Sequence, residues 1–267
     1  MRTSKLAFFG IIIFLLSSFI KENPILDRLE VEYPNNEQQL NLEQIKIKNS
    51  KSHMNISLDT TIQDWPNLER FKKENKMLGL PKKGEKRIVF MGNSITQSWL
   101  DHSPEFFKEN NYINRGISGQ TTPQMLLRFR ADVIELQPKA VVILAGTNDI
   151  AGNTGPMTLD QILGNMISMV ELAKANNIKV IVSSVLPAHD YAWRPGLHPD
   201  KKIPELNKMI KAYAKEANII YLDYFSAMVD DRNGLPEKLS QDGVHPTKEG
   251  YLVMEPLAKS AIKKALR

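Results

Sequence analysis

The sequence predicts an α/β fold in which a five-stranded parallel sheet lies between two layers of helices. Short apolar runs of strand length alternate with longer amphipathic stretches of helix length. The run at 140–145 is apolar throughout, which is typical of a strand covered on both faces. No internal repeat is present that would indicate a solenoid or propeller. Strands that alternate with helices in this way form a doubly wound sheet.

The expected elements follow one another from residue 65 onward. The first is a helix over 65–78, with Asp64 as its candidate N-cap and Pro66 in its first turn. Strands are expected at 87–91, 112–117, 140–145, 179–186 and 219–225. Helices are expected at 98–110, 122–136, 159–175, 201–217 and 248–265, and Pro104 should divide the first of these.

Composition limits the classes of protein and site that fit. The chain has 267 residues, a net charge of +5 and no cysteine. The absence of cysteine excludes disulfides, thiolate metal sites and a cysteine nucleophile. The lysines are scattered or form short runs such as 82–87, which we interpret as solvated surface. We therefore expect no nucleic-acid partner.

The N-terminus has the pattern of a secretory signal peptide. Residues 1–5 carry two positive charges, and 6–20 form an apolar block that is short for a membrane span. The predicted location is periplasmic or secreted. An uncleaved membrane anchor is the alternative, because no small-x-small cleavage site is evident. Residues 21–61 are polar with weak periodicity and predict a linker or extension, and 62–267 form one domain.

Four short polar clusters carry the candidate chemistry, each after a predicted strand or near the C-terminus. Because parallel strands end at one edge of a sheet, we expect the clusters to meet there. They are Gly92-Asn93-Ser94, "NRGISGQTT" with Gly116 and Gly119, "AGTND" with Asn148 and Asp149, and "DGVHP" with Asp242 and His245.

These residue types suit acyl transfer by a serine nucleophile. Ser94 needs a general base to remove its proton, and His245 is the candidate base. Asp242 lies three residues before His245, close enough for one turn to bring the carboxylate to the imidazole. Backbone N–H groups of Ser94 and Gly119 and the side-chain amide of Asn148 could stabilise an oxyanion.

Each cluster also has a purely structural interpretation. Gly-x-Ser after a strand is most often a turn, and "GTND" could be a helix entry capped by Asp149. Asp242 and His245 could form an Asx turn on the surface. The functional interpretation depends on the clusters occurring together and in this order.

The four clusters resemble the blocks of the SGNH (GDSL-type) esterase/lipase superfamily. The match is Ser94 in "GNSIT", Gly119 in "ISGQTT", Asn148 in "GTND" and His245 in "DGVHP", with Asp242 as the third triad member. It covers about residues 87–267, so 62–267 is predicted to be the SGNH hydrolase domain. The resemblance implies a flavodoxin-like three-layer α/β/α sandwich and hydrolysis of esters, often acetyl esters on carbohydrates, without a metal or other cofactor. The lead-in "DWPNLERFKKEN" is similar to exported bacterial members.

One residue departs from the family pattern. Asn93 stands where the family usually has an aspartate before the serine. This residue is not the triad acid, so we expect the chemistry to survive. Asparagine can accept a hydrogen bond there but brings no charge, which leaves the stability of the turn and the pH profile open.

A loop after the fourth strand is the candidate substrate wall. In "PAHDYAWRPGLHP", Tyr191 and Trp193 could stack on a sugar ring and Arg194 could bind a carboxylate. The alternative is a loop packed on its own hydrophobic residues. A metal site from His189 and its neighbours is less favoured, and we predict none.

The sequence thus predicts a secreted serine esterase that removes small acyl groups, acetyl above all, from carbohydrates. Its partner would be a small-molecule or glycan ester, with no membrane contact beyond a possible N-terminal anchor. A lysophospholipase or broad arylesterase is the alternative enzyme, although no extended apolar insertion could hold a long acyl chain. A glycan-binding relative without turnover is the other alternative, although no triad residue is missing.

Overall fold

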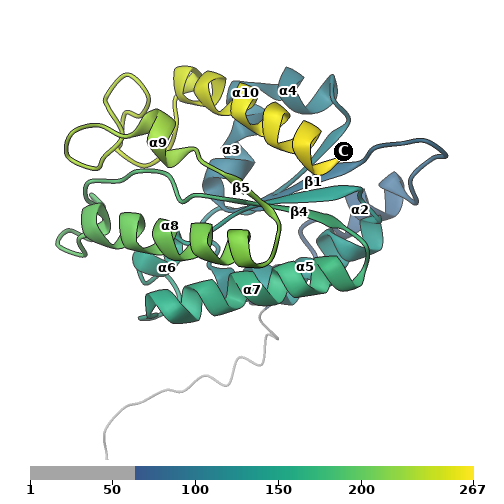
Figure 1. Cartoon of the computed structure of the whole chain (residues 1–267), viewed down its shortest axis with the longest axis horizontal. Helices are drawn as coiled ribbons and strands as arrows, with labels where there is room; N and C mark the ends of the chain where they lie inside the picture. Colours follow the sequence, from purple (N-terminus) through teal and green to yellow (C-terminus); the bar gives the residue numbers. More distant parts are fainter. Residues whose placement is uncertain (1–63) are drawn as a thin grey trace, which may run out of the picture. The chain divides into compact units, whose positions relative to one another are not determined.

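Five parallel strands form the sheet at the centre of the computed structural model, which describes residues 64–267 (Figure 1). Their order is β2-β1-β3-β4-β5, which confirms the predicted flavodoxin-like α/β fold. The signal peptide and linker predicted at 1–20 and 21–61 lie outside the described residues. The strands are β1 (Ile88–Gly92), β2 (Tyr112–Gly116), β3 (Ala140–Leu144), β4 (Lys179–Ser183) and β5 (Ile220–Leu222).

Helices cover both faces of this sheet. Helices α3, α4 and α10 lie on one face, and α5, α7 and α8 lie on the other (Figure 1). Within residues 64–267, no helix has both the length and the apolar character needed to cross a bilayer. The helices are α2 (Lys72–Leu78), α3 (Ser94–His102), α4 (Pro104–Lys108), α5 (Thr122–Asp132), the 3-10 turn η1 (Ile134–Leu136), α6 (Thr147–Ile150), α7 (Leu159–Ala175), α8 (Pro199–Glu216), α9 (Phe225–Met228) and α10 (Lys248–Ala265).

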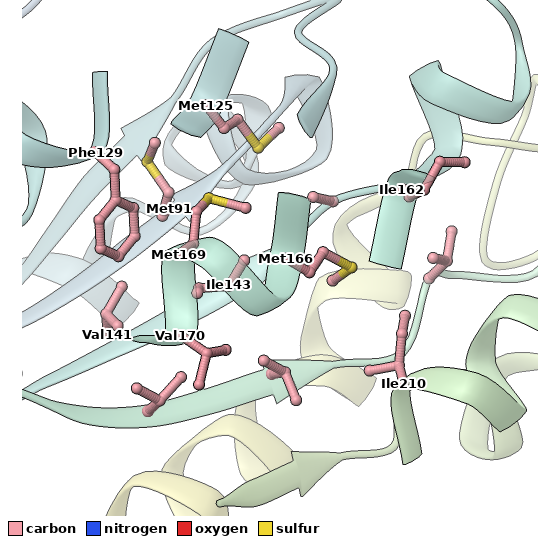
Figure 2. Packing of buried hydrophobic residues seen from close by; sticks show 14 of the residues in the cluster. Met91, Met125, Phe129, Val141, Ile143, Ile162, Met166, Met169, Val170 and Ile210 are labelled. Carbon is pink, nitrogen blue, oxygen red and sulfur yellow. The ribbon is translucent and has the colours of Figure 1, made fainter. Parts of the chain in front are cut away.

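Alternate residues of the central strands pack into two separate cores. Met91 of β1 lies in a methionine-rich core with Met125 of α5 and Met169 of α7 (Figure 2). On the opposite face, the Phe90 ring makes an edge contact with the Trp99 ring, at 5.8 Å between centroids. Burial on both sides explains why the central strands are apolar at every position.

The expected helix at 65–78 is wrong in its first half. Residues 65–71 form turns, and α2 begins only at Lys72. Asn67 has φ of +62°, in the left-handed region, which a helix cannot contain. Asp64 accepts hydrogen bonds from the backbone of Leu68 and Glu69, both at 2.8 Å, so it stabilises a turn rather than the start of α2.

The carboxyl ends of the central strands lie level with one another. Gly92 is paired in register with Gly116 of β2 and with Leu144 of β3. A Cβ on Gly92 would lie 2.0 Å from Thr96 Oγ1, and one on Gly116 would lie 2.2 Å from the Gln97 nitrogen. Only glycine at these two strand ends lets α3 turn back so closely over the sheet.

Candidate active site

Ser94 stands at the junction between β1 and α3. The strand ends at Gly92, Asn93 caps the helix, and Ser94 is its first residue. Asn93 is fully buried, and its side-chain oxygen accepts a hydrogen bond from the Ile95 nitrogen at 3.0 Å. The turn therefore holds the serine at the tip of a central strand.

Ser94, His245 and Asp242 form a continuous hydrogen-bonded chain. Ser94 Oγ lies 2.9 Å from His245 Nε2, and His245 Nδ1 lies 2.6 Å from Asp242 Oδ2. With the ring proton on Nδ1, Nε2 accepts from the serine hydroxyl. Tyr251 of α10 donates from its hydroxyl to the Ile95 carbonyl of α3 at 2.8 Å, so the helix after His245 is tied to the helix that begins at Ser94.

The carboxylate of Asp242 organises the turn that carries His245. Its Oδ1 accepts from the backbone nitrogens of His245 and Val244, at 2.7 and 2.9 Å, and from Ser240 Oγ at 3.1 Å. Partial burial acts to raise the pKa of Asp242, but the hydrogen bonds from His245 and Val244 prevail and lower it to about 2. The carboxylate is therefore ionised at neutral pH, as the partner of an imidazolium must be.

Three N–H donors are available at the same edge. Among the residues that the structure describes, none accepts from the backbone N–H of Ser94 or Gly119. Gly119 has φ of +75°, which favours glycine at this position. Asn148 of α6 donates from Nδ2 to the Gln120 carbonyl at 2.9 Å, which orients the amide and leaves its second hydrogen for another acceptor.

Arg128 is a residue of this edge that the sequence reasoning missed. Its side chain on α5 is fully buried and donates from Nη2 to the carbonyls of Gly92 and Arg115, at 3.0 and 2.9 Å. It also donates from Nε to Gln120 Oε1 at 2.5 Å and pairs with Asp132 at 2.9 Å. The sequence carried one signal for this ion pair, the spacing of its two residues. Arg128 and Asp132 are four residues apart, so they share one face of α5, and that face is buried.

Asp149 of the third cluster has a structural role. Its Oδ1 accepts from the backbone nitrogen and the hydroxyl of Thr122, at 2.8 and 2.5 Å. Burial raises the pKa of Asp149, against the lowering effect of the Thr122 hydrogen bonds. Asp149 therefore joins the loop after β3 to the first turn of α5, beside the residues of the second cluster.

The candidate substrate loop needs one correction. Tyr191 is fully buried and its hydroxyl lies 2.9 Å from Thr147 Oγ1, so it supports α6 and has no ring face open to a substrate. Trp193 is 46% exposed and stacks on Tyr191, with centroids 5.1 Å apart. Arg194 Nη1 donates to the carbonyls of Ala151 and Gly152, at 2.8 and 2.7 Å. The contribution of Trp193 and Arg194 to binding stays a prediction.

The histidines of this loop do not gather into a metal site. His189 Nδ1 lies 3.0 Å from the Arg232 carbonyl oxygen, and His198 Nδ1 lies 3.9 Å from Asp200. In the part of the chain from 64 to 267, no three histidine or carboxylate side chains are grouped so that they could hold a metal ion.

A polar cavity of about 450 Å³ lies beside Gly119. Four segments distant in sequence form it: the turn at 64–67, residues 117–120 with Gln124 of α5, residues 153–154, and Arg194. Ile117 is its one aliphatic side chain and Trp65 its one aromatic side chain. The polar side chains of its wall are Asp64, Asn67, Ser118, Gln120, Gln124, Asn153, Thr154 and Arg194.

A family model for the GDSL-like lipase/acylhydrolase family matches residues 90–253. The chain belongs to this family. The matched segment contains all four clusters, and the predicted resemblance is therefore confirmed. Membership also establishes the reaction class, because the family consists of acylhydrolases: the protein is a GDSL-type ester hydrolase.

Three relatives place this hydrolase among known proteins. A GDSL-like lipase of Bacteroides thetaiotaomicron is 53% identical, with a TM-score of 0.74, over 76% of this chain and 100% of its own. Platelet-activating factor acetylhydrolase IB subunit alpha2 of Rattus norvegicus is 27% identical over 62% of this chain and 72% of its own length. An acetylxylan esterase of Geobacillus stearothermophilus is 25% identical over 53% of this chain and 67% of its own.

Proposed function

We propose that this hydrolase is a secreted serine esterase that removes small acyl groups, acetyl above all, from carbohydrates. The observation that carries the proposal is the chain of hydrogen bonds from Ser94 Oγ through His245 to Asp242, at 2.9 and 2.6 Å. A serine hydroxyl in this arrangement can lose its proton to the imidazole as it attacks.

The proposed reaction has two halves. His245 Nε2 takes the Ser94 proton while Oγ attacks the ester carbon, and the negative oxygen that forms accepts hydrogen bonds from Ser94 N–H, Gly119 N–H and Asn148 Nδ2. The imidazolium then protonates the leaving alcohol as its bond to the carbonyl carbon breaks, which leaves an acyl group on Ser94. Water activated by His245 attacks that acyl group, and the acid departs as Ser94 regains its proton.

The wall of the cavity beside Gly119 supports a polar alcohol as the leaving group. Its hydrogen-bonding side chains suit sugar hydroxyls, whereas Ile117 is its one aliphatic side chain and is itself buried. A long acyl chain or lipid tail would find little apolar surface there. The acetylxylan esterase relative, whose name gives an acetyl ester on xylan, supports the same choice.

Export is supported by the sequence of the N-terminus. Two positive charges precede the apolar block at 6–20, which is the order of regions in a signal peptide. The test is the mass of the mature protein recovered from the periplasm or medium of an expressing bacterium. Loss of about the first 20 residues, the block that ends a signal peptide, is expected, and an intact chain in the membrane fraction would favour the anchor.

The hydrolytic mechanism is tested by covalent labelling. Incubation with a serine-directed phosphonate should add one adduct by intact mass, together with turnover of p-nitrophenyl acetate. The Ser94→Ala variant should show neither, while keeping the melting temperature of the wild type. A folded wild type with no adduct and no turnover would instead favour a glycan-binding relative without catalysis.

A lipid or broad esterase is the competing function, and the acetylhydrolase relative of Rattus norvegicus favours it. A series of p-nitrophenyl esters from acetate to octanoate separates the two. Falling kcat/KM with chain length supports the small-acyl enzyme, and release of acetate from acetylated xylooligosaccharides supports the carbohydrate. Rising kcat/KM with chain length would support a lipid-directed enzyme.

A further inference from the structure

The turn at 64–67 is fixed against the second cluster by two glutamines. Gln124 Nε2 donates to the Trp65 carbonyl and Gln120 Nε2 donates to the Pro66 carbonyl, both at 2.8 Å. Within the turn, the Asn67 nitrogen donates to the Asp64 carbonyl at 2.8 Å. Side-chain amides that bond backbone carbonyls at both Trp65 and Pro66 hold this turn in one place.

The same turn is connected to the oxyanion donors. Gln120, whose side chain bonds the turn, also accepts from Asn148 Nδ2 through its own carbonyl at 2.9 Å. Its side-chain oxygen accepts from the buried Arg128. The turn therefore has a defined position relative to Asn148 and Gly119, the groups that would surround the reacting carbonyl.

Trp65 is the one aromatic side chain in the wall of the cavity beside Gly119, and it is 46% exposed. An exposed tryptophan alone is unremarkable on a protein surface. Here, however, it shares a cavity with amide and hydroxyl side chains such as Asn67, Asn153 and Thr154. An apolar plane with hydrogen-bonding groups around it matches a pyranose ring, which has an apolar C–H face and a polar rim.

We propose that Trp65 is the specificity-determining residue of this esterase and stacks on the pyranose ring that carries the acyl group. This inference rests on the proposed function, because it assumes that the ester reacts at Ser94 beside Gly119. The sequence predicted that aromatic residues of the loop at 187–199 stack on the sugar. The proposal gives that role to Trp65, in the turn at 64–67. The acyl group would point to Ser94, and the sugar would occupy the polar cavity.

Trp193 is the competing aromatic candidate, because it has the same exposed fraction of 46%, although it lies outside the wall of this cavity. Three variants of the full chain are compared: Trp65→Ala, Trp65→Phe and Trp193→Ala. Each is assayed on a fully acetylated methyl xylopyranoside and on glycerol triacetate, which carries the same acyl group on an acyclic alcohol.

Trp65→Ala should lower kcat/KM about tenfold on the pyranoside, mainly through KM, and leave glycerol triacetate nearly unchanged. Trp65→Phe should restore most of the loss, because it keeps an aromatic plane. Trp193→Ala should lower kcat/KM on the pyranoside less than Trp65→Ala does. Melting temperatures of all three variants check that the fold is intact.

Three outcomes would overturn the proposal. An equal loss on both substrates in Trp65→Ala means that the residue only supports the fold. If Trp65→Ala shows normal kinetics on the pyranoside, or if the loss appears in Trp193→Ala instead, then Trp65 does not determine specificity. The proposed function would still stand. A wild type that hydrolyses glycerol triacetate but no acetylated pyranoside overturns both the carbohydrate substrate and the role of Trp65.

Discussion

The proposed nucleophile and its proposed base lie in very different structural surroundings. Ser94 is 8% exposed at the end of a central strand, and the buried Arg128 bonds the carbonyl at that strand end. His245 and Asp242 have side chains that are 38% and 49% exposed, on a turn held by hydrogen bonds among residues 240–245. One half of the site is part of the core, and the other half is a surface turn.

This contrast predicts which residues of the site contribute mainly to folding stability and which contribute mainly to catalysis. Residues that hold the β1–α3 junction at Ser94 are buried and bonded to several elements, so replacing them should cost folding free energy. Residues of the turn at 240–245 contact few elements, so replacing them should lower turnover far more than it lowers stability at neutral pH. Five variants test whether stability and turnover separate in this way.

His245→Ala should show the largest effect, a loss of about 10⁶-fold in kcat, because the base of a serine hydrolase acts as a unit with the nucleophile. Its melting temperature should stay close to that of the wild type. The measurement is turnover of p-nitrophenyl acetate beside thermal unfolding. His102→Ala is the control and should remain active, since His102 lies in the hollow beside Asp242 but outside the hydrogen-bonded chain from Ser94 to Asp242.

Asp242→Asn should lower kcat about 10⁴-fold, because the neutral amide no longer fixes the imidazole or stabilises its charged form. The pKa of Asp242 is about 2, below the ordinary value of 3.8, so the ionised carboxylate stabilises the folded state above pH 3.8. That stability is lost as the pH falls through about 2. Unfolding followed from pH 5 to pH 2 should therefore show a steeper loss for wild type than for Asp242→Asn. Parallel curves would contradict this.

Arg128→Met tests the buried half and should destabilise the fold by about 3–5 kcal/mol, because Asp132 would keep a buried charge without its partner. The free energy of unfolding in urea measures the effect. Lys72→Met is the control, since it removes a cation from the pair with Glu69, whose two side chains are 70% and 69% exposed, and it should change stability little. Similar losses in both variants would show that burial does not separate the two pairs.

Asn148→Ala should lower kcat by about 10²–10³-fold with little change in KM, because the amide acts on the oxyanion and not on the bound ester. Steady-state kinetics on p-nitrophenyl acetate resolve the two constants. If KM rises as much as kcat falls, and the melting temperature drops, then Asn148 serves chiefly to hold the Gln120 loop.

Asn93→Asp should have the smallest effect, a change in kcat/KM within about tenfold, or about 1.4 kcal/mol in the barrier. An aspartate keeps an oxygen for the Ile95 nitrogen and removes the Nδ2 group, which has no partner among residues 64–267. Its negative charge at the start of α3 is favourable, whereas its burial is not. A pH–rate profile beside the wild type checks this, and a gain of several orders of magnitude would contradict it.

The predictable parts of the fold are those whose signals are local. Helices α7 and α10 begin and end at the residues expected, because Thr158 and Thr247 cap them and long apolar periodicity runs through them. The four-residue helices α6 and α9 were not predicted, since one turn is too short to show a periodicity. The helix expected at 65–78 failed because a left-handed Asn67 and the distant Gln120 and Gln124 shape its first half.

The candidate site follows the same division. Short motifs located Ser94, Asp242 and His245, because each motif carries its own turn chemistry. The bonds of Gln120 to Pro66 and of Arg128 to Gly92 became visible only in three dimensions, since each joins two distant segments of the chain. Tyr191 was misassigned for a related reason: in a loop without periodicity, the sequence does not tell which aromatic ring points inward.

The bond from Tyr251 to Ile95 has a consequence for the order of events in synthesis. The proposed base His245 is 151 residues downstream of the proposed nucleophile Ser94, and α10, the helix that ties the two together, follows the base. Because the ribosome synthesises a chain from its N-terminus, Ser94 is made long before His245 and α10. A nascent chain that ends before α10 therefore lacks the bond from Tyr251 to Ile95, and the proposed triad can be assembled only after α10 has been synthesised.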